Sequence, residues 1–185
     1  MSARAIATDL SGVLIIEPIV HRDARGFFFE SYNERTFTRL GIADRFIQDN
    51  HSRSERGVLR GIHYQDLRAP LGKLVRCTRG AILDVAVDLR VQSPTFGHHV
   101  AVELTEDNAR QLWVPVGFGH GFATLSEIAE VQYKCTGFYV PECEGAIRWN
   151  DPELAIGWPF TEPTLSARDA TSSSFADYRT RPAFR

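Results

Sequence analysis

Short apolar runs bounded by glycine or proline recur along the chain, and they constrain its fold more than any other feature. Within many of them apolar and polar side chains alternate, which is the two-residue period of a β-strand with one buried face. Many such strands, separated by turn signals, are typical of an antiparallel sandwich or barrel. The sequence therefore predicts an all-β fold. The strands are expected at GVLIIEP, GFFFESY, VLRGIHY, KLVRC, AILDVAVDL, HHVAVEL, RQLWVP, GFATLS, EVQYKCTGFYV and AIRW.

A helix is expected only at YNERTFTRLG, residues 32–41, where Asn33 is a candidate N-cap and Gly41 would follow the last turn. From about residue 161 the chain becomes polar and rich in serine and threonine. This tail is expected either to form a short helix on the barrel or to be partly disordered. Because no repeat or low-complexity linker divides the chain, residues 1–185 are predicted to form a single domain that includes this tail.

The charge balance argues against a nucleic-acid partner. A formal net charge of −2 supplies no basic field, so any phosphate site must be local. No apolar run approaches the roughly 20 residues that span a bilayer, and the N-terminus lacks the apolar core of a signal peptide. We therefore expect a cytoplasmic protein with no membrane partner.

The cysteines Cys77, Cys135 and Cys143 are odd in number and form no C-x-x-C pair. This pattern argues against both a disulfide framework and a thiolate zinc site. We expect all three to be reduced and mostly buried, as free cysteines usually are.

The strand AILDVAVDL, residues 81–89, assigns its side chains to two faces. Asp84 and Asp88 share the face opposite the aliphatic one. For Asp88, at the strand end beside Arg90, a solvated edge is expected. For Asp84, in mid-strand, a polar cavity is one alternative, because an unpaired buried carboxylate would be costly. The aliphatic face carries Leu83, Val85, Val87 and Leu89.

Two histidines, His63 and His120, lie in GVLRGIHYQ and PVGFGHGF. The spacings of glycine, proline and histidine there resemble parts of the two motifs of the cupin superfamily, small β-barrels of the jelly-roll type. Metal-binding cupins continue the first motif with a second histidine, where this chain has Gln65, and then with a glutamate that it lacks. Two imidazoles and an amide make a poor divalent site, so we expect no metal. His63 is then either a packed strand residue or a base.

Arg60 and His63 would point to opposite faces of a regular strand, and a bulge at Gly61 would turn both inward. Other polar residues fall in or beside predicted strands, so a barrel lined by them would hold guanidinium groups for a diphosphate, amides for a base or sugar, and acid and base groups. These residues are Arg25, Gln48, Asn50, Lys73, Tyr133, Arg168 and Asp169.

A series of motifs over about residues 12–170 resembles, in order, the RmlC-type dTDP-4-dehydrorhamnose 3,5-epimerase family. The resemblance implies a cupin-type jelly-roll barrel with a few short helices, an isomerase without cofactor, and a homodimer. Its substrate would be dTDP-4-dehydro-6-deoxy-D-glucose, whose C3 and C5 would be inverted through an enolate. The motifs are DARGFFFESYN, QDNHS, VLRGIHYQ, GKLVRC, DVAVDLR, SPTFG, RQLWVPVGFGHGF, YKCTGFYVPECEGAIRWNDP and LSARDA.

The resemblance also implies roles for single residues. The family's base matches His63, and the carboxylate that orients it matches Asp169. The acid of the opposite face matches Tyr133, and the ammonium near O4 matches Lys73. Positions that contact substrate in the family match Arg25, Glu30, Gln48, Asp49, Asn50, Arg60, Lys73, His120, Glu144 and Arg168.

Two further assignments follow the resemblance. Asp84, on the cavity face by period, is the predicted partner of His120. Either Phe138 or Tyr139 is expected to stack on thymine. The chain departs from the family at Arg168, where lysine is frequent, and at Phe138, where a second tyrosine is common.

Two alternatives stay open. Related enzymes epimerise only C3 or only C5 of the same ketosugar, and the same base and acid would serve them. The intact QDNHS, GFGHGF and YKC motifs favour the double epimerase. The second alternative is a non-catalytic sugar-nucleotide-binding or metal-binding cupin.

Overall fold

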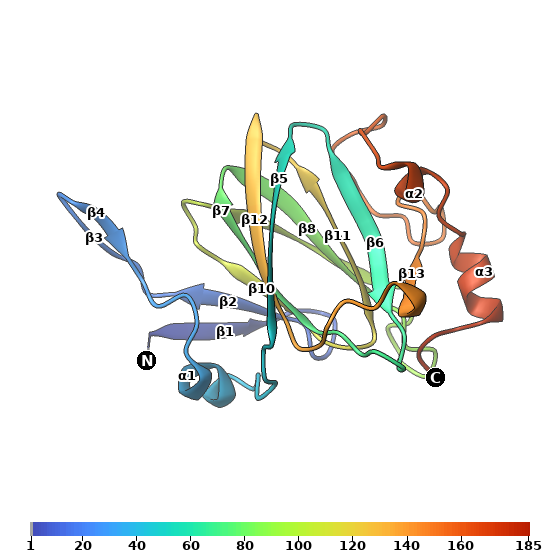
Figure 1. Cartoon of the computed structure of the whole chain (residues 1–185), viewed down its shortest axis with the longest axis horizontal. Coiled ribbons are helices and arrows are strands. Elements are labelled where there is room, and N and C mark those ends of the chain that lie inside the picture. Colours follow the sequence, from blue (N-terminus) through green and yellow to red (C-terminus); the bar gives the residue numbers. More distant parts are fainter. Residues whose placement is uncertain (1) are drawn as a thin grey trace.

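Two antiparallel sheets face each other and form a barrel in the computed structural model, which describes residues 2–185 (Figure 1). The predicted all-β fold with a few short helices is confirmed. The six-stranded sheet runs in the order β1 (Ala3–Ala7), β2 (Leu14–Pro18), β10 (Gln111–Val114), β7 (Lys73–Arg79), β12 (Ile128–Cys135) and β5 (Gln48–Glu55). The five-stranded sheet runs in the order β13 (Glu144–Ala146), β6 (Leu59–Gln65), β11 (Phe118–Thr124), β8 (Ala81–Asp88) and β9 (His99–Thr105).

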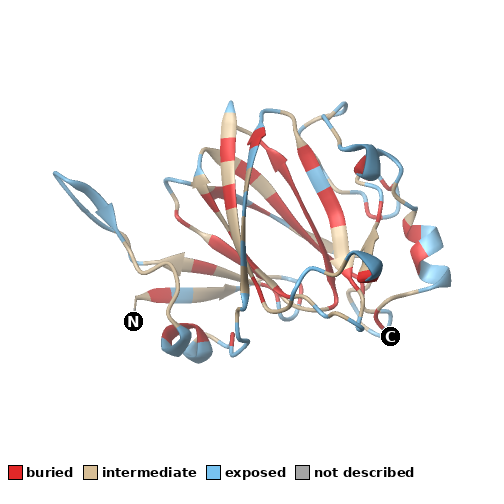
Figure 2. Ribbon diagram, viewed as in Figure 1, coloured by how far each residue is buried: buried red, intermediate tan, exposed pale blue. Residues whose placement is uncertain are grey.

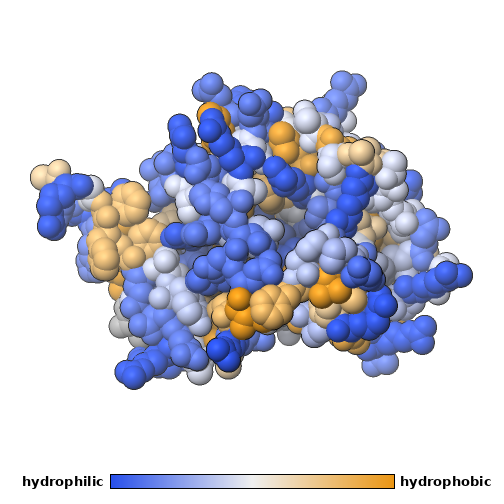
Figure 3. All heavy atoms as spheres, viewed as in Figure 1, coloured by the Kyte–Doolittle hydropathy of each residue, from blue (hydrophilic) through white to orange (hydrophobic). Residues whose placement is uncertain are grey.

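A separate hairpin of β3 (His21–Asp23) and β4 (Gly26–Phe28) projects from the barrel (Figure 1). All of its strand residues are exposed, and they form the pale blue arm of Figure 2. The predicted strand GFFFESY therefore shortens to β4. Its apolar side chains, which include Phe27 and Phe28, make an apolar patch on the projecting arm (Figure 3).

The helix predicted after this arm is confirmed as α1 (Glu34–Arg39). The Asn33 side chain accepts hydrogen bonds from the backbone N–H groups of Arg35 and Thr36, as an N-cap does. Gly41, just beyond the C-cap, has a φ of +94°, a conformation that favours glycine. The N-cap residue and the glycine that were named from the sequence therefore define the two ends of the helix.

The barrel interior is apolar and contains residues of both sheets, among them Val75, Ile82, Ala86 and Val131. Figure 2 shows the buried positions as red bands along the strands. Ile82 and Ala86 lie inside, whereas the alternate residues of β8 lie on the outer face of the five-stranded sheet, as the two-residue period predicts.

The tail covers that outer face. It contains α2 (Ala167–Ala170) and α3 (Phe175–Thr180), and Phe175, Tyr178 and Phe184 are buried against β8. The Tyr178 hydroxyl donates a hydrogen bond of 2.7 Å to the carbonyl of Leu89. Of the two alternatives for the tail, packing on the barrel is therefore correct, and its few large apolar residues carry that packing.

Asp88 corrects a prediction, because it is fully buried and not solvated. Its carboxylate accepts hydrogen bonds from Arg90 at 2.8 Å and from the hydroxyls of Ser93 and Thr95. Burial raises the pKa of Asp88, but these hydrogen bonds lower it by more, to about 2. The loop that follows β8 thus folds back and supplies hydrogen bonds to a carboxylate that the strand pattern alone would place in solvent.

This carboxylate makes stability depend on pH. Its pKa is lower in the folded chain than in the unfolded one. Its contribution to the free energy of unfolding is therefore present above about pH 4 and is lost as the pH falls toward 2. Replacement of Asp88 by asparagine is expected to lower the free energy of unfolding by about 2 kcal/mol at pH 6. At pH 3 the expected loss is about 1 kcal/mol smaller. Urea unfolding of both proteins at the two pH values measures this. A pH-independent difference would contradict the assignment.

Candidate active site

A cleft opens into the barrel between the two sheets, and it has two lobes that share His63, Lys73 and Tyr133. The Arg60 lobe has a volume of about 410 Å³ and also contains Ser52, Arg60, His120, Phe122, Thr164, Arg168 and Asp169. The Glu144 lobe has a volume of about 420 Å³ and also contains Gln48, Asn50, Tyr64, Gln65, Tyr139 and Glu144. Both volumes are within the range of small-molecule sites.

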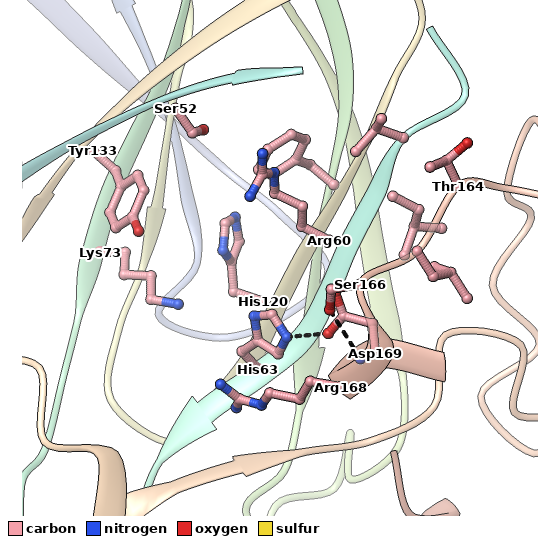
Figure 4. A pocket seen from close by; sticks show the side chains of 14 residues that line it. Ser52, Arg60, His63, Lys73, His120, Tyr133, Thr164, Ser166, Arg168 and Asp169 are labelled. Atoms are coloured by element: carbon pink, nitrogen blue, oxygen red, sulfur yellow. Dashed lines mark hydrogen bonds and ion pairs between the residues drawn. The ribbon is translucent and has the colours of Figure 1, made fainter. Parts of the chain in front are cut away.

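Facing sheets supply the groups at the junction of the lobes. His63 on β6 and His120 on β11 belong to the five-stranded sheet, whereas Lys73 on β7 and Tyr133 on β12 belong to the six-stranded sheet. Figure 4 shows the two pairs pointing toward each other across the cleft. A flat ligand held between the sheets would therefore meet an imidazole on one face and a phenol on the other.

His63 is fixed by Asp169, as the resemblance implied. Its Nε2 lies 2.5 Å from Oδ1 of Asp169, a residue of α2 (Figure 4). The Ser166 side chain caps α2 and accepts a hydrogen bond from the backbone N–H of Asp169. Burial raises the pKa of Asp169, but the hydrogen bond and charge of His63, together with Ser166 and Arg168, lower it by more, so the group is a carboxylate at neutral pH. With the Nε2 proton held by that carboxylate, the lone pair of neutral His63 is on Nδ1, toward the cleft.

Arg60 and His63 do share the cleft, because β6 bulges between them. His63 pairs with His120, and Arg60 pairs with Phe122, so three steps along β6 match two along β11. Gly61 has a φ of +124°, and the Gly61–Ile62 peptide is cis. The bulge expected at Gly61 is confirmed.

Replacement of Gly61 by alanine is expected to destabilise the chain by about 3 kcal/mol or more. An added Cβ would lie 2.4 Å from Gly121 Cα and 2.8 Å from the His120 carbonyl oxygen. Gly57 is the matched control, because it also has a positive φ but no atom within 4 Å of an added Cβ, so its alanine variant should lose only about 1 kcal/mol. Urea unfolding measures both. Equal losses would show that the close approach of β6 and β11 at Gly61 is not what requires glycine.

Lys73 and Tyr133 sit deep in the cleft. Burial lowers the pKa of the Lys73 ammonium and raises the pKa of the Tyr133 phenol. Tyr133 therefore holds its proton at neutral pH, as an acid must before it donates. The Lys73 ammonium lies 5.9 Å from the centre of the Tyr133 ring, so its charge is close to the phenol.

Glu144 organises the other lobe. Its Oε2 accepts from the Tyr139 hydroxyl at 2.6 Å and from the Arg168 guanidinium at 2.5 Å. Burial raises the pKa of Glu144, but these two donors lower it by more, so it stays ionised. Gln48 accepts from the Tyr139 backbone N–H and donates to Asn50. The lobe thus combines amides and an aromatic ring, and its carboxylate is bonded to the Arg168 guanidinium of the Arg60 lobe.

Four of the predicted substrate-binding residues do not line this cleft. Arg25 lies on the projecting arm and pairs with Asp23, and Glu30 accepts hydrogen bonds from Ser2 and Asn33. Phe138 is 64% exposed.

Asp49 pairs with Lys134, because strand alternation turns it away from Gln48 and Asn50, its neighbours on β5. One chain therefore does not bring these four side chains to the cleft, and their contact with substrate stays a prediction.

Other cleft residues were not singled out from the sequence. Ser52 follows Gln48 and Asn50 at the same two-residue period, so recognising β5 as a strand would have found it. Phe122 could be found by the same period, counted from His120. Gln65 was named from the sequence only as the residue that stands in place of a metal-binding histidine. It is buried, and it donates to the carbonyls of Ala69 and Phe138 and so holds the loop that carries Tyr139.

Neither metal-site geometry nor a membrane span is found in the described chain. No group of three or more His, Cys, Asp or Glu within residues 2–185 is placed to hold a metal ion. The three cysteines are free and buried, as predicted. Over the same residues, no helix has the length and apolar character needed to cross a bilayer.

Comparison with known proteins identifies relatives over most of the chain. The family model of dTDP-4-dehydrorhamnose 3,5-epimerase matches residues 7–177. The chain is 56% identical to the dTDP-4-dehydrorhamnose 3,5-epimerase of Salmonella typhimurium, over 90% of this chain and 92% of that one.

Solved structures are similar over nearly the whole fold. The dTDP-6-deoxy-D-glucose-3,5-epimerase of Legionella pneumophila, in complex with dTDP-4-keto-L-rhamnose, has a TM-score of 0.91 and 47% identity, with 99% of each chain covered. A 3′-monoepimerase of Streptomyces bikiniensis in complex with dTDP-quinovose has a TM-score of 0.88 and 35% identity, over 94% of this chain and 88% of that one. The chain therefore belongs to the dTDP-4-dehydrorhamnose 3,5-epimerase family.

Proposed function

We propose that this chain converts dTDP-4-dehydro-6-deoxy-D-glucose to dTDP-4-dehydro-L-rhamnose by inverting C3 and C5. Both carbons flank the C4 carbonyl, so their hydrogens are acidic and their removal gives an enolate with its charge on O4. Inversion needs a base on one face of the sugar and an acid on the other. The observation that carries the proposal is the placement of His63 and Tyr133 on facing sheets at the junction of the lobes.

In this proposal His63 takes the proton through Nδ1, while Asp169 holds Nε2 and stabilises the imidazolium that forms. Tyr133 returns a proton to the opposite face of the enolate carbon. Lys73, in the same cleft, stabilises the negative charge that develops on O4. The site needs no redox step, because the substrate and the product have the same oxidation state.

The two lobes suit the two ends of the substrate. The Glu144 lobe would hold the nucleotide, with Gln48 and Asn50 as amide partners and Tyr139 as the ring that stacks on thymine. Of the two aromatic candidates we favour Tyr139, because it lines the lobe and Phe138 does not. Arg60 and Arg168 would bind the diphosphate through charge-assisted hydrogen bonds.

The projecting arm supports the proposal of a homodimer. Phe27 and Phe28 are 60% and 73% exposed, and an apolar arm of this kind normally lies against a partner. Arg25 at its tip and Glu30 behind it would then reach the cleft of the second copy. The tail that packs on the barrel also supports the proposal that the chain works as one domain.

The dimer is testable by sedimentation. Wild-type protein is expected to sediment at twice the chain mass at micromolar concentration, and replacing Phe27 and Phe28 by aspartate should shift it toward the monomer. Replacing the exposed Leu67 by aspartate, away from the arm, is the control and should leave the dimer intact. A wild-type monomer would contradict the proposal.

Product analysis tests the activity. With dTDP-4-dehydro-6-deoxy-D-glucose as substrate, NMR should show inversion at both C3 and C5. Inversion at one carbon alone would identify a single-site epimerase like the monoepimerase relative, which is less similar to this chain than the Salmonella enzyme. No turnover, or turnover lost in EDTA and restored by a divalent ion, would favour a binding or metal-dependent cupin.

A further inference from the structure

Four aspartates are buried among residues 2–185, and one of them has no task in the site or in the strands. Asp169 holds the base, and Asp88 is bonded to the loop after β8. Asp84 Oδ1 lies 2.8 Å from His120 Nε2, as predicted. The fourth, Asp151, is 2% exposed and lines neither lobe of the cleft. Its contacts lead to the tail.

The tail segment of residues 165–172 carries α2 to the cleft, and little besides the site itself holds it there. Within residues 2–185, its hydrogen bonds to groups outside the tail are those of Asp169 to His63 and of Arg168 to Glu144 (Figure 4). None of its side chains belongs to an apolar cluster of the described chain. The place of α2 is therefore set by how the chain is attached on either side of it.

Backbone hydrogen bonds attach both ends of this segment to the five-stranded sheet. Before it, the Thr164 N–H donates to the carbonyl of Gly57 at 2.9 Å, and the Thr164 carbonyl accepts from the N–H of Leu59 at 3.1 Å. After it, the Ser173 carbonyl accepts from the N–H of Arg148 at 2.8 Å. The first attachment is at the start of β6, and the second is just beyond β13.

Asp151 adds a side-chain attachment at the second end. Its Oδ1 accepts from the backbone N–H of Glu153 at 3.0 Å, which completes a local turn. Its Oδ2 accepts from Arg148 Nε at 2.9 Å and from the backbone N–H of Phe175 at 2.9 Å. Burial raises the pKa of Asp151, but these donors lower it by more, so the group stays ionised. The local turn explains Oδ1, whereas Oδ2 reaches a residue 24 positions away.

The contact with Phe175 requires a carboxylate. Phe175 is the first residue of α3, so its N–H has no acceptor within the helix, and it is buried. Both oxygens of Asp151 accept from backbone N–H groups. An asparagine would turn its NH2 group toward one of these donors and leave that donor unpaired. Asp151 therefore joins the start of α3 to the loop after β13 in a way that its amide cannot.

We propose that Asp151 is a positioning residue, which fixes α2 so that Asp169 meets His63 in the orientation that holds the base. The same attachment places the Arg168 guanidinium for the diphosphate. It acts in the frame of the base, because β13 pairs with β6 and Ala146 is the register partner of His63. A misplacement of about 1 Å caused far from the chemistry can lower a rate about 100-fold. This inference rests on the proposed function.

A double-mutant cycle tests it. Asp151→Asn is expected to lower kcat about 10- to 100-fold, because the base loses its orientation. It should also raise KM about three- to tenfold, because Arg168 moves with the same helix. In the Asp169→Asn background, Asp151→Asn should lower kcat by less than about twofold, since the group through which it acts on the base is gone, whereas the rise in KM remains.

The matched control is Asp88→Asn. It removes another buried carboxylate that an arginine and backbone groups hold, but one that has no contact with α2. Its loss of stability should be comparable, while kcat and KM stay within about twofold of wild type. A general loss of stability would affect both variants alike, so the comparison isolates the positioning of α2.

A spectroscopic readout separates this inference from the activity. In ¹H–¹⁵N correlation spectra of the histidine rings, the His63 Nε2–H signal should lie downfield, as for an N–H bonded to a carboxylate, and Asp151→Asn should shift it upfield. Asp88→Asn should leave it in place. If Asp151→Asn does not fold, Arg148→Ala replaces it, because it removes a donor to the same oxygen from an exposed position and should shift the signal in the same direction.

Three results would overturn the inference: an unchanged His63 signal, an unchanged kcat, or kcat losses that multiply in the double variant. Inactive wild-type protein would instead overturn the proposed function, and the position of the His63 signal would still test whether Asp151 holds α2.

Discussion

Replacement of His63 by alanine is expected to lower proton exchange at C3 and at C5 by about 10²- to 10⁴-fold, the usual contribution of a general base. Both carbons should be affected, because His63 is the only imidazole of the described residues that combines a cleft position in both lobes with a carboxylate on its far nitrogen. Incubation in D2O, with deuterium at each carbon followed by NMR, measures the two rates separately.

The control is His98→Ala, which removes an exposed imidazole outside the cleft and should leave both rates unchanged. Thermal unfolding of each variant shows that the fold is intact. Full exchange at either carbon in His63→Ala would assign that deprotonation to another group.

Replacement of Tyr133 by phenylalanine is expected to separate exchange from inversion. The base remains, so protons still leave C3 and C5, but the face toward the six-stranded sheet loses its donor. The enolate is then reprotonated by His63 on the face from which the proton left. Deuterium should therefore enter substrate of unchanged configuration within about tenfold of the wild-type rate, while inverted product falls about 10²- to 10⁴-fold.

Tyr32→Phe is the matched control, because Tyr32 packs between Phe37 and Phe46 outside the cleft and its loss of a hydroxyl should change neither rate. If Tyr133→Phe lost exchange and inversion equally, the phenol would be needed for proton removal too, and the assignment of His63 as the only base would fail. If it inverted one carbon normally, a second acid would serve that carbon.

The fold was predictable where burial alternates with exposure. The period of β8 assigned its two faces correctly, because each face packs against a different apolar layer. The alternation of apolar and polar residues did not reveal β5 (Gln48–Glu55). The inner face of this strand lines the polar cleft, and its outer face is polar as well. A strand without an apolar face has no periodic signal, although its hydrogen bonds to β12 are complete along its length.

The burial of Asp88 could not be predicted from the sequence. Its position at a strand end predicted contact with solvent, but its carboxylate is buried and accepts hydrogen bonds from Ser93 and Thr95. These two residues lie in a loop whose path no local sequence pattern encodes. The tail is similar, since Phe175, Tyr178 and Phe184 are spaced too widely in a polar segment to predict what they cover.

The residues of the site also differ in how far the sequence could place them. The strand-borne residues His63, Lys73, His120 and Tyr133 meet in the cleft because register fixes their places. Asp169 reaches His63 from 106 residues away, a contact that only the family resemblance suggested. Arg25 and Glu30 belong to an arm that leaves the barrel, so one chain alone does not bring them to the cleft.

The most direct test of the account is a structure of the protein with a dTDP-sugar that lacks the C4 carbonyl and cannot react. The sugar ring should lie between the two sheets, with His63 Nδ1 and Tyr133 Oη on opposite faces and each within about 3.5 Å of C3 or C5. A ring with both groups on one face, or bound outside the junction of the lobes, would contradict the proposed inversion.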